Sequence, residues 1–201
     1  MESKNYYDLT TTEKNAFFAF LDEASKETSA PAHINMRVED YENQVHTLLY
    51  ILEKTDRFKN GNDGIFQILF DGDKVAACSG AYRSSFCSDL ALLGVRTWIH
   101  KSYRNQLISR EFLLPYEKKW AIENDHKALG LTFNEYNKNL ILLWNKIRFG
   151  EHRTSRQPHH FGYNGVHCVD FLINIQYTMQ YIIYEKLDPN WSYNWESLRQ
   201  A

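Results

Sequence analysis

Apolar side chains recur at intervals of three and four residues in the first quarter of the chain, the spacing that places them on one face of an α-helix. Thr10 and Glu13 have the spacing of a capping box, so a helix is predicted to begin there and to run to about Glu27. Pro31 then interrupts the helical pattern. A second apolar stripe predicts another helix over residues 38–55, so the chain is expected to open with two helices.

From residue 64 onward the pattern changes to that of β-strands. Residues 65–70 and 74–82 are apolar runs on either side of the turn Asp71-Gly72-Asp73, which predicts a β-hairpin. Residues 90–99 are rich in Leu, Val, Thr and Trp and predict a third strand. Residues 127–133 predict a fourth.

Polar residues 100–106 separate the third strand from a helix that is predicted to begin near Leu107. Pro115 lies about two turns into this helix, where a proline costs roughly 3 kcal/mol unless the backbone adapts. We therefore expect a bend at residues 111–114 or a late start of the regular helix. A helix that directly follows a strand turns its unpaired first N–H groups outward, which favours phosphate binding.

The pattern of residues 134–164 predicts a helix and then a loop. Asn134 or Asn137 can cap a helix that ends at Gly150. Pro158 is among the residues that predict a loop over 151–164.

The remaining apolar residues predict strands that close the sheet. Alternation indicates one strand from residue 166 and another over 177–183. Near the N-terminus, residues 5–9 are the one candidate strand. The tail, residues 189–201, is expected to dock onto the domain through its aromatic side chains. These are Trp191, Tyr193 and Trp195.

Composition narrows the class of protein. The 201 residues are 43% hydrophobic, enough for one substantial core and a single domain. A formal net charge of −2 gives no argument for nucleic acid or for an acidic membrane surface as partner. Three cysteines without a CxxC spacing fit a reducing compartment, and the polar start MESKNYYDL does not resemble a signal peptide. We expect a cytoplasmic protein with no membrane contact.

The run WIHKSYRNQLIS, from Trp98 to Ser109, resembles the acyl-CoA-binding segment of the GNAT superfamily of N-acetyltransferases. In that superfamily a strand leads into Tyr-Arg-x-x-Gly-x-Gly or Ala, whose backbone amides hold the CoA pyrophosphate. Tyr103 and Arg104 match this motif, whereas Leu107 and Ser109 stand at the glycine positions. The loop is therefore a degenerate version of the motif, in which Leu107 could narrow the site.

Residues 132–149 resemble the late strand and helix of the same superfamily, read as Asn-x-x-Ala-x-x-Leu-Tyr-x-x-x-Gly-Phe. Asn137, Leu143 and Phe149 fall in register with it. Trp144 replaces the tyrosine.

The resemblance implies an α/β fold (α+β) with a mixed, mostly antiparallel twisted sheet and helices on both faces. The sheet is expected to splay between strands 90–99 and 127–133. It also implies one domain over residues 1–201. Its parts are an N-terminal helical part (1–57), an acyl-CoA-binding core (64–150), a loop with C-terminal strands (151–188) and an aromatic tail (189–201).

The implied activity is direct transfer of an acetyl group from acetyl-CoA, as co-substrate, to an amine of a small molecule or peptide. The resemblance places the co-substrate against the end of the central strand, the following loop and one residue of the late helix. These residues are Trp98, Ile99, His100, Arg104, Asn105, Gln106, Leu107, Ile108, Ser109 and Asn137.

Acyl transfer to an amine needs a base for the amine and an acid for the leaving thiolate. His100 has a suitable intrinsic pKa for the base, with Asp89, Glu111 or a water chain as alternatives. Trp144 cannot replace the acidic tyrosine, because an indole N–H is a donor with no acid function. Tyr136 is the candidate acid, and Tyr103 is an alternative.

Two other readings of the sequence stay open. The chain could be a catalytically inactive GNAT-fold binding or interaction protein that has lost the glycine loop, or an unrelated α/β protein that imitates the pattern. Four late histidines suggest a metal site, but they lack the spacing of a ligand set, so no metal is expected. They are His152, His159, His160 and His167.

Overall fold

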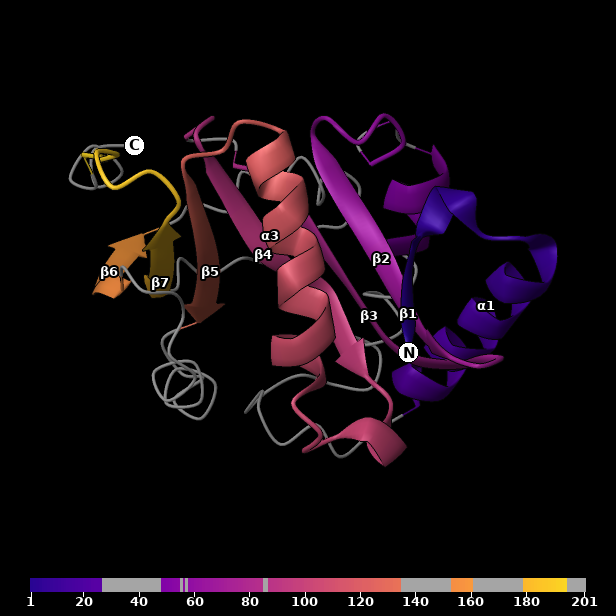
Figure 1. Ribbon diagram of the computed structural model, residues 1–201. Coiled ribbons are helices and arrows are strands. Elements are labelled where there is room, and N and C mark those ends of the chain that lie inside the picture. The colour runs from indigo at the N-terminus through magenta and orange to yellow at the C-terminus, as the bar shows by residue number, and fades with distance from the viewer. Residues whose placement is uncertain are drawn as a thin grey trace.

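A computed structural model describes residues 1–26, 48–54, 56, 58–84, 87–134, 153–160 and 179–194. Within these residues, strands form one seven-stranded sheet in the order β1-β2-β3-β4-β5-β7-β6 (Figure 1). The strands are β1 Glu2–Asn5, β2 Gly64–Asp71, β3 Lys74–Arg83, β4 Leu90–Ile99, β5 Ala128–Asn134, β6 Arg153–His160 and β7 Met179–Lys186. Neighbouring strands are antiparallel except β4 and β5, which are parallel.

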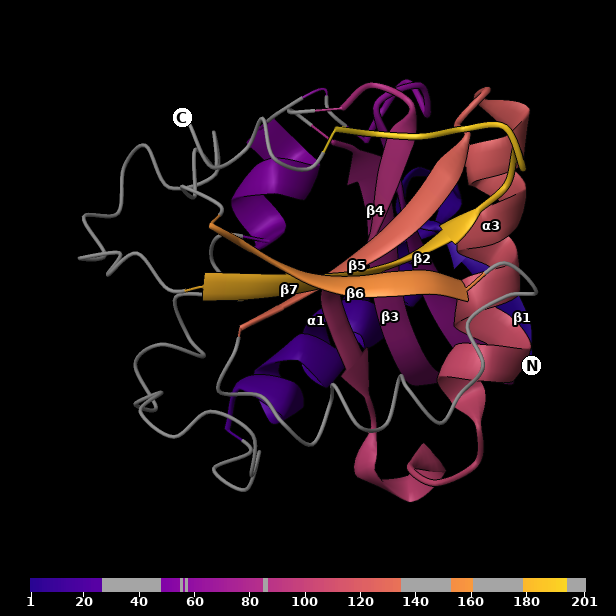
Figure 2. The same cartoon turned by 90° about the vertical axis from the view of Figure 1, so that its left-hand side faces the viewer.

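Helices lie on both faces of this sheet (Figure 2). One face carries α1 (Thr11–Ser25) and the helical residues 48–54. The opposite face carries α3 (Leu114–Glu123). Short turns of 3-10 helix, η1 (Tyr6–Asp8) and η2 (Lys101–Tyr103), and of π-helix, η3 (Ser109–Leu113), complete the described helices. The predicted mixed, mostly antiparallel sheet with helices on both faces is confirmed.

The hairpin of β2 and β3 and the capped start of α1 lie where the sequence predicted them, but two other predictions were wrong. The first strand is Glu2–Asn5 rather than 5–9, because the Asn5 side chain accepts a hydrogen bond from the Tyr7 N–H (3.1 Å) and starts η1. The stretch predicted as a loop contains β6. Pro158 is tolerated there because β6 lies at the end of the described sheet order, where a missing ladder donor costs least.

Pro115 lies in the first turn of α3, so the predicted late start of the regular helix is confirmed. A proline is compatible with this position because the first N–H groups of a helix have no partner within the helix. The π-helical turn η3 joins the preceding loop to α3. The predicted helix ending at Gly150, the strand from residue 166 and most of the helix over 38–55 lie outside the described residues.

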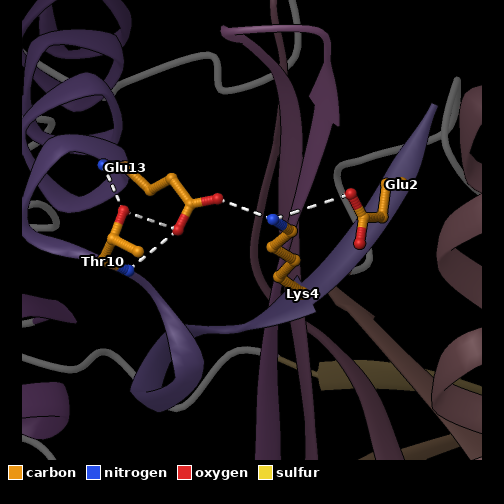
Figure 3. Close-up of polar contacts among 4 residues, drawn as sticks. All are labelled: Glu2, Lys4, Thr10 and Glu13. Carbon is orange, nitrogen blue, oxygen red and sulfur yellow. Dashed lines mark hydrogen bonds and ion pairs between the residues drawn. The ribbon is translucent and has the colours of Figure 1, made fainter.

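A capping box fixes the start of α1 and connects it to the first strand (Figure 3). Thr10 Oγ1 accepts from the Glu13 N–H (3.3 Å), and Glu13 Oε2 accepts from the Thr10 N–H (2.8 Å). Glu13 Oε1 also accepts from Lys4 Nζ of β1 at 2.6 Å. The bond from Lys4, and then those from Thr10, lower the pKa of Glu13 to about 2. These contacts therefore stabilise the fold above the ordinary carboxyl pKa and are lost as the pH falls toward 2.

We expect Thr10→Ala to lower the free energy of unfolding by about 1 kcal/mol, because the Glu13 N–H loses its acceptor, Thr10 Oγ1. Urea unfolding measures the change. Thr12→Ala is the matched control. Thr12 is exposed, lies two residues after Thr10 and is not part of the capping box. Equal stability of the two variants would contradict the capping role.

Each face of the sheet has its own apolar core. On the α1 face the largest buried side chains are aromatic, with Phe17 of α1 and Phe66 of β2 both fully buried. On the α3 face, Trp120 and Ala121 pack against residues of the central strands. The predicted docking of the tail is confirmed for its described part, because Trp191 is buried against Tyr184 with ring centroids 5.8 Å apart.

Candidate functional site

The parallel strands β4 and β5 are paired only at their beginnings. The register joins Leu90 to Ala128, Ala91 to Leu129 and Leu92 to Gly130. Beyond these pairs the two strands diverge, as Figure 1 shows, while each continues to its own end. The predicted splaying of the sheet between these strands is confirmed. Because of this splaying, the C-terminal half of β4 makes no pairs with β5.

An irregularity in β4 accompanies this divergence. Cys78 of β3 pairs with Trp98, but Gly80 pairs with Val95, so two residues of β4 lie opposite the single residue Ser79. A bulge of this kind bends a strand and increases its twist. The bulge lies immediately before Trp98 and Ile99, where the resemblance places the co-substrate.

The turn after β4 is attached to three separate parts of the fold. Tyr103 Oη donates to Asp71 Oδ2 in the β2–β3 hairpin (3.0 Å), and Lys101 Nζ donates to Glu23 Oε1 of α1 (2.9 Å). Arg104 Nε donates to the backbone oxygen of Ile99 (3.1 Å). The hydrogen bond to Asp71 raises the pKa of Tyr103, which keeps the phenol neutral. These contacts fix the position from which the following loop starts.

Residues 105–109 form a loop with left-handed backbone at two positions. Asn105 has a φ of 65° and Leu107 a φ of 57°, in the region that glycine adopts most readily. Leu107 is 54% exposed, so its side chain does not fill the core beneath α3. Ile108, by contrast, is 2% exposed and packs with Leu113 at the start of the helix. The buried side chain of Ile108 thus holds the loop against the sheet, while that of Leu107 is exposed.

The backbone amides of this loop make no backbone hydrogen bonds within the described part of the fold. Among the described residues, none accepts a backbone hydrogen bond from the N–H groups of residues 105–109. The next two amides, of Arg110 and Glu111, both donate to the oxygen of Leu107 at 2.9 Å. Successive amides without acceptors at a helix start form a site for an anion.

His100 has a local role in the turn. Its Nδ1 accepts a hydrogen bond from the Ser102 N–H (3.2 Å), which caps η2. Its Nε2 lies 3.5 Å from Glu23 Oε1. Both ring nitrogens therefore face groups of the protein itself.

The predicted site residues of β4 and the loop come together at the end of the diverging strands. Trp98 packs against the core of the α1 face and Ile99 against that of the α3 face. Tyr136 and Asn137 lie outside the described residues, as does Trp144. No group of three or more His, Cys, Asp or Glu side chains within the described part of the chain could hold a metal ion. No helix in that part is long and apolar enough to cross a bilayer.

Sequence reasoning missed a line of polar side chains beneath α3, here called the polar row. It consists of Gln67 in β2, Ser79 in β3, Thr97 in β4 and Glu117 in α3. Glu117 is 3% exposed, and burial raises its pKa to about 8. The available signal was Gln67 at the centre of the otherwise apolar run IFQILF.

Comparison with known proteins gives similarity of structure only. No protein-family model and no curated protein matches the sequence. A GNAT-family acetyltransferase from Staphylococcus aureus Mu50 matches with a TM-score of 0.57 and 13% identity, over 93% of this chain and 99% of that one. A ribosomal-protein-alanine N-acetyltransferase from Brucella melitensis matches with a TM-score of 0.55 and 16% identity, over 93% and 100% of the two chains.

A third structure, from Salmonella typhimurium, was assigned as an acetyltransferase and contains its cofactor acetyl-CoA. It matches with a TM-score of 0.55 and 14% identity, over 96% of this chain and 97% of that one. At such identities the similarity shows the fold, and the chain has the GNAT, or acyl-CoA N-acyltransferase, fold.

Proposed function

We propose that the protein is an N-acetyltransferase that moves an acetyl group from acetyl-CoA to an amine by direct transfer. The observation that carries this proposal is the position of loop 105–109. Its five amides, which lack acceptors among the described residues, lie at the end of β4, where β4 and β5 have diverged. A pyrophosphate at these amides would let the rest of the molecule extend along the unpaired side of β4.

The residues of the loop fit this role in spite of the missing glycines. Glycine is useful where the backbone must adopt a positive φ and approach a ligand. Leu107 adopts the positive φ, and its exposed side chain leaves the backbone as the ligand-facing group. Arg104 begins the loop and supports anion binding with its charge, and Asn137 is a further proposed contact.

In the proposed reaction, acetyl-CoA supplies an activated thioester. The amine attacks its carbonyl carbon, whose oxygen is stabilised by a backbone N–H near Trp98, Ile99 or His100. His100 is the proposed base for the amine, and Tyr136 the acid that the sequence alone suggests for the thiolate. The acceptor is a primary amine of a small molecule or peptide, and the cytoplasm is the proposed compartment.

Calorimetric titration with acetyl-CoA, and separately with CoA, tests the proposal. We expect saturable binding, with a Kd on the order of micromolar. If neither compound gave binding heat, in a sample with a cooperative unfolding transition, an acyl-CoA site would be excluded.

A second candidate, a non-catalytic acetyl-CoA-binding protein, is supported by Trp144 at the position of the tyrosine acid. Turnover distinguishes it from a transferase. A transferase releases CoA thiol when the protein, acetyl-CoA and a panel of primary amines are combined. Suitable amines are spermidine, a lysine-containing peptide and a peptide with an N-terminal alanine. A non-catalytic binding protein retains acetyl-CoA without releasing thiol.

The role of His100 is tested with His100→Asn. Asparagine can cap η2 through its side-chain oxygen, so the turn and acetyl-CoA binding should persist. If the imidazole is the base, thiol release at neutral pH should fall about 100-fold, the lower range for general acid–base catalysis. Glu23→Gln is the control, since it removes the charge beside Nε2 and keeps the ring. A rate within twofold of wild type would exclude His100 as the base.

A further inference from the structure

The polar row crosses the face of the sheet that α3 covers. Gln67 and Ser79 are paired neighbours on β2 and β3. Ser79 Oγ and Thr97 Oγ1 are hydrogen-bonded at 2.7 Å, so the hydroxyls continue onto β4. Glu117 of α3 lies next to Gln67 and Ser79, whose side-chain hydrogen bonds both lower its pKa. Gln67, Ser79 and Glu117 are buried, with 0%, 1% and 3% exposure, whereas Thr97 is exposed.

Two buried acceptor oxygens without partners favour a proton on Glu117. Gln67 Nε2 donates to the backbone oxygen of Leu113 at 2.8 Å, which fixes the orientation of the amide. Gln67 Oε1 and Glu117 Oε1 are both buried, and neither has a hydrogen-bond partner. Two acceptor oxygens cannot satisfy each other. A neutral carboxyl, however, has one O–H, which either Gln67 Oε1 or Ser79 Oγ can accept.

The surroundings of Glu117 agree with a neutral carboxyl. Burial is the largest influence and raises its pKa to about 8, opposed only by Ser79 and Gln67. No charged group of the described residues contributes to this shift. The neighbouring elements present an amide from β2, a hydroxyl from β3 and a backbone oxygen from η3. An isolated carboxylate is strongly disfavoured in such a place, so the proton is retained near neutral pH.

The exposed end of the row lies beside the proposed acyl-CoA path. Thr97 belongs to the bulged part of β4, beyond the last pair between β4 and β5, and directly precedes Trp98. Two hydroxyls thus connect a buried acid to the strand along which the thioester would lie. A hydroxyl both donates and accepts, so Ser79 and Thr97 can pass a proton on.

We propose that Glu117 supplies, through Ser79 and Thr97, the proton that the leaving CoA thiolate takes up. This inference rests on the proposed acetyltransferase function. The C–S bond breaks and its electron pair stays on sulfur. Sulfur then takes the Thr97 hydroxyl proton, Thr97 takes that of Ser79, and Ser79 takes that of Glu117. The amine meanwhile loses one proton to its base, and Glu117 regains one from solvent, so protons balance over the cycle.

In this scheme Thr97 is the catalytic residue, because it contacts the sulfur, and Glu117 and Ser79 act through it as positioning residues. The route gives the reaction an acid that does not depend on the position occupied by Trp144. The relay also gives a functional role to the buried Glu117 carboxyl, which lowers the stability of the fold. Above the ordinary carboxyl pKa the unfolded chain ionises Glu117 while the fold does not, so the group disfavours folding as the pH rises toward 8.

The test compares Glu117→Gln and Thr97→Val with Glu123→Gln, an exposed control on the same helix. Calorimetry gives the acetyl-CoA affinity. Thiol release from acetyl-CoA with the best amine of the panel gives kcat. The rate is measured between pH 6 and 10, about two units either side of the pKa of Glu117, which is about 8. Infrared spectroscopy at pH 7 detects the carbonyl stretch of a neutral carboxyl.

We expect Glu117→Gln to lower kcat by at least about 100-fold, the lower end of the range for general acid catalysis, with unchanged affinity. Wild-type kcat should fall as the pH rises through about 8, and this fall should be absent in the variant. Thr97→Val should lower kcat equally without changing the neutral-carboxyl band. That band should disappear in Glu117→Gln, which should unfold at a higher urea concentration than wild type. Glu123→Gln should match wild type throughout.

The outcomes separate the two proposals. If Glu117→Gln kept the affinity, the kcat and the pH profile of the wild type, the relay would be overturned and the transferase proposal would stand. A neutral-carboxyl band that survives the substitution would also overturn it. Failure of the wild-type protein to bind acetyl-CoA or to release thiol with any amine would remove the transferase and the relay together.

Discussion

Leu107→Asp is expected to weaken acetyl-CoA binding by roughly 30- to 100-fold. A carboxylate at this position would lie close to the pyrophosphate that loop 105–109 is proposed to hold. Two like charges about 5 Å apart repel by about 2 to 3 kcal/mol at the dielectric of a partly exposed site, and each 1.4 kcal/mol is tenfold in affinity. Calorimetric titration at low ionic strength measures the loss, which should shrink as salt is added.

The matched control for this substitution is Leu107→Asn. Asparagine and aspartate have the same size, and both tolerate the positive φ of this position. The pair therefore differs in charge alone. Leu107→Asn should bind acetyl-CoA within about threefold of wild type. Equal affinities for the two variants would show that phosphates do not approach this turn.

Phe17→Ala should lower the free energy of unfolding by about 3 to 5 kcal/mol, the range for removal of a buried phenyl ring. Phe17 is fully buried, and its ring lies near four others, of which that of Phe18 is 6.1 Å away between centroids. Its centroid lies 5.9 Å from Tyr6, 6.4 Å from Phe20 and 6.1 Å from Phe66. Since whole domains are stable by only about 5 to 15 kcal/mol, much of the protein could unfold at 37 °C. Urea unfolding at 15 °C measures the change.

Phe18→Ala is the control for the core substitution. Phe18 is the next residue of α1 and is only partly buried at the edge of the same cluster. Its loss should cost distinctly less, because solvent already reaches the ring. If both variants lost the same stability, the aromatic cluster on the α1 face would not be the main core of that face.

Leu107 and Glu117 show two ways in which a residue type can mislead. Leucine at a glycine position suggested a blocked loop, yet the backbone there has the glycine-like conformation and the side chain is exposed. Glutamate is a residue type that is mostly exposed, yet Glu117 of α3 is buried. In both cases the orientation of the residue, rather than its type, decides its effect.

Local signals in the sequence determined much of the fold. The capping box at Thr10, the hairpin around Gly72 and the strand, turn and helix from residue 90 onward depend on hydrogen bonds and periodicity within a few residues. Such interactions are encoded by neighbours in the chain, which is why they could be predicted. The match of Tyr103 and Arg104 to an acyl-CoA-binding motif was likewise local.

Only the tertiary structure decided the features that join distant segments. The divergence of β4 from β5, the bulge opposite Ser79 and the place of β6 at the end of the described sheet order depend on which strands pair and in what register. The contact of Gln67 with Leu113 spans 46 residues of sequence. The raised pKa of Glu117 follows from its burial next to Gln67 of β2 and Ser79 of β3. A one-dimensional pattern contains none of these pairings, because they are set by packing of the whole chain.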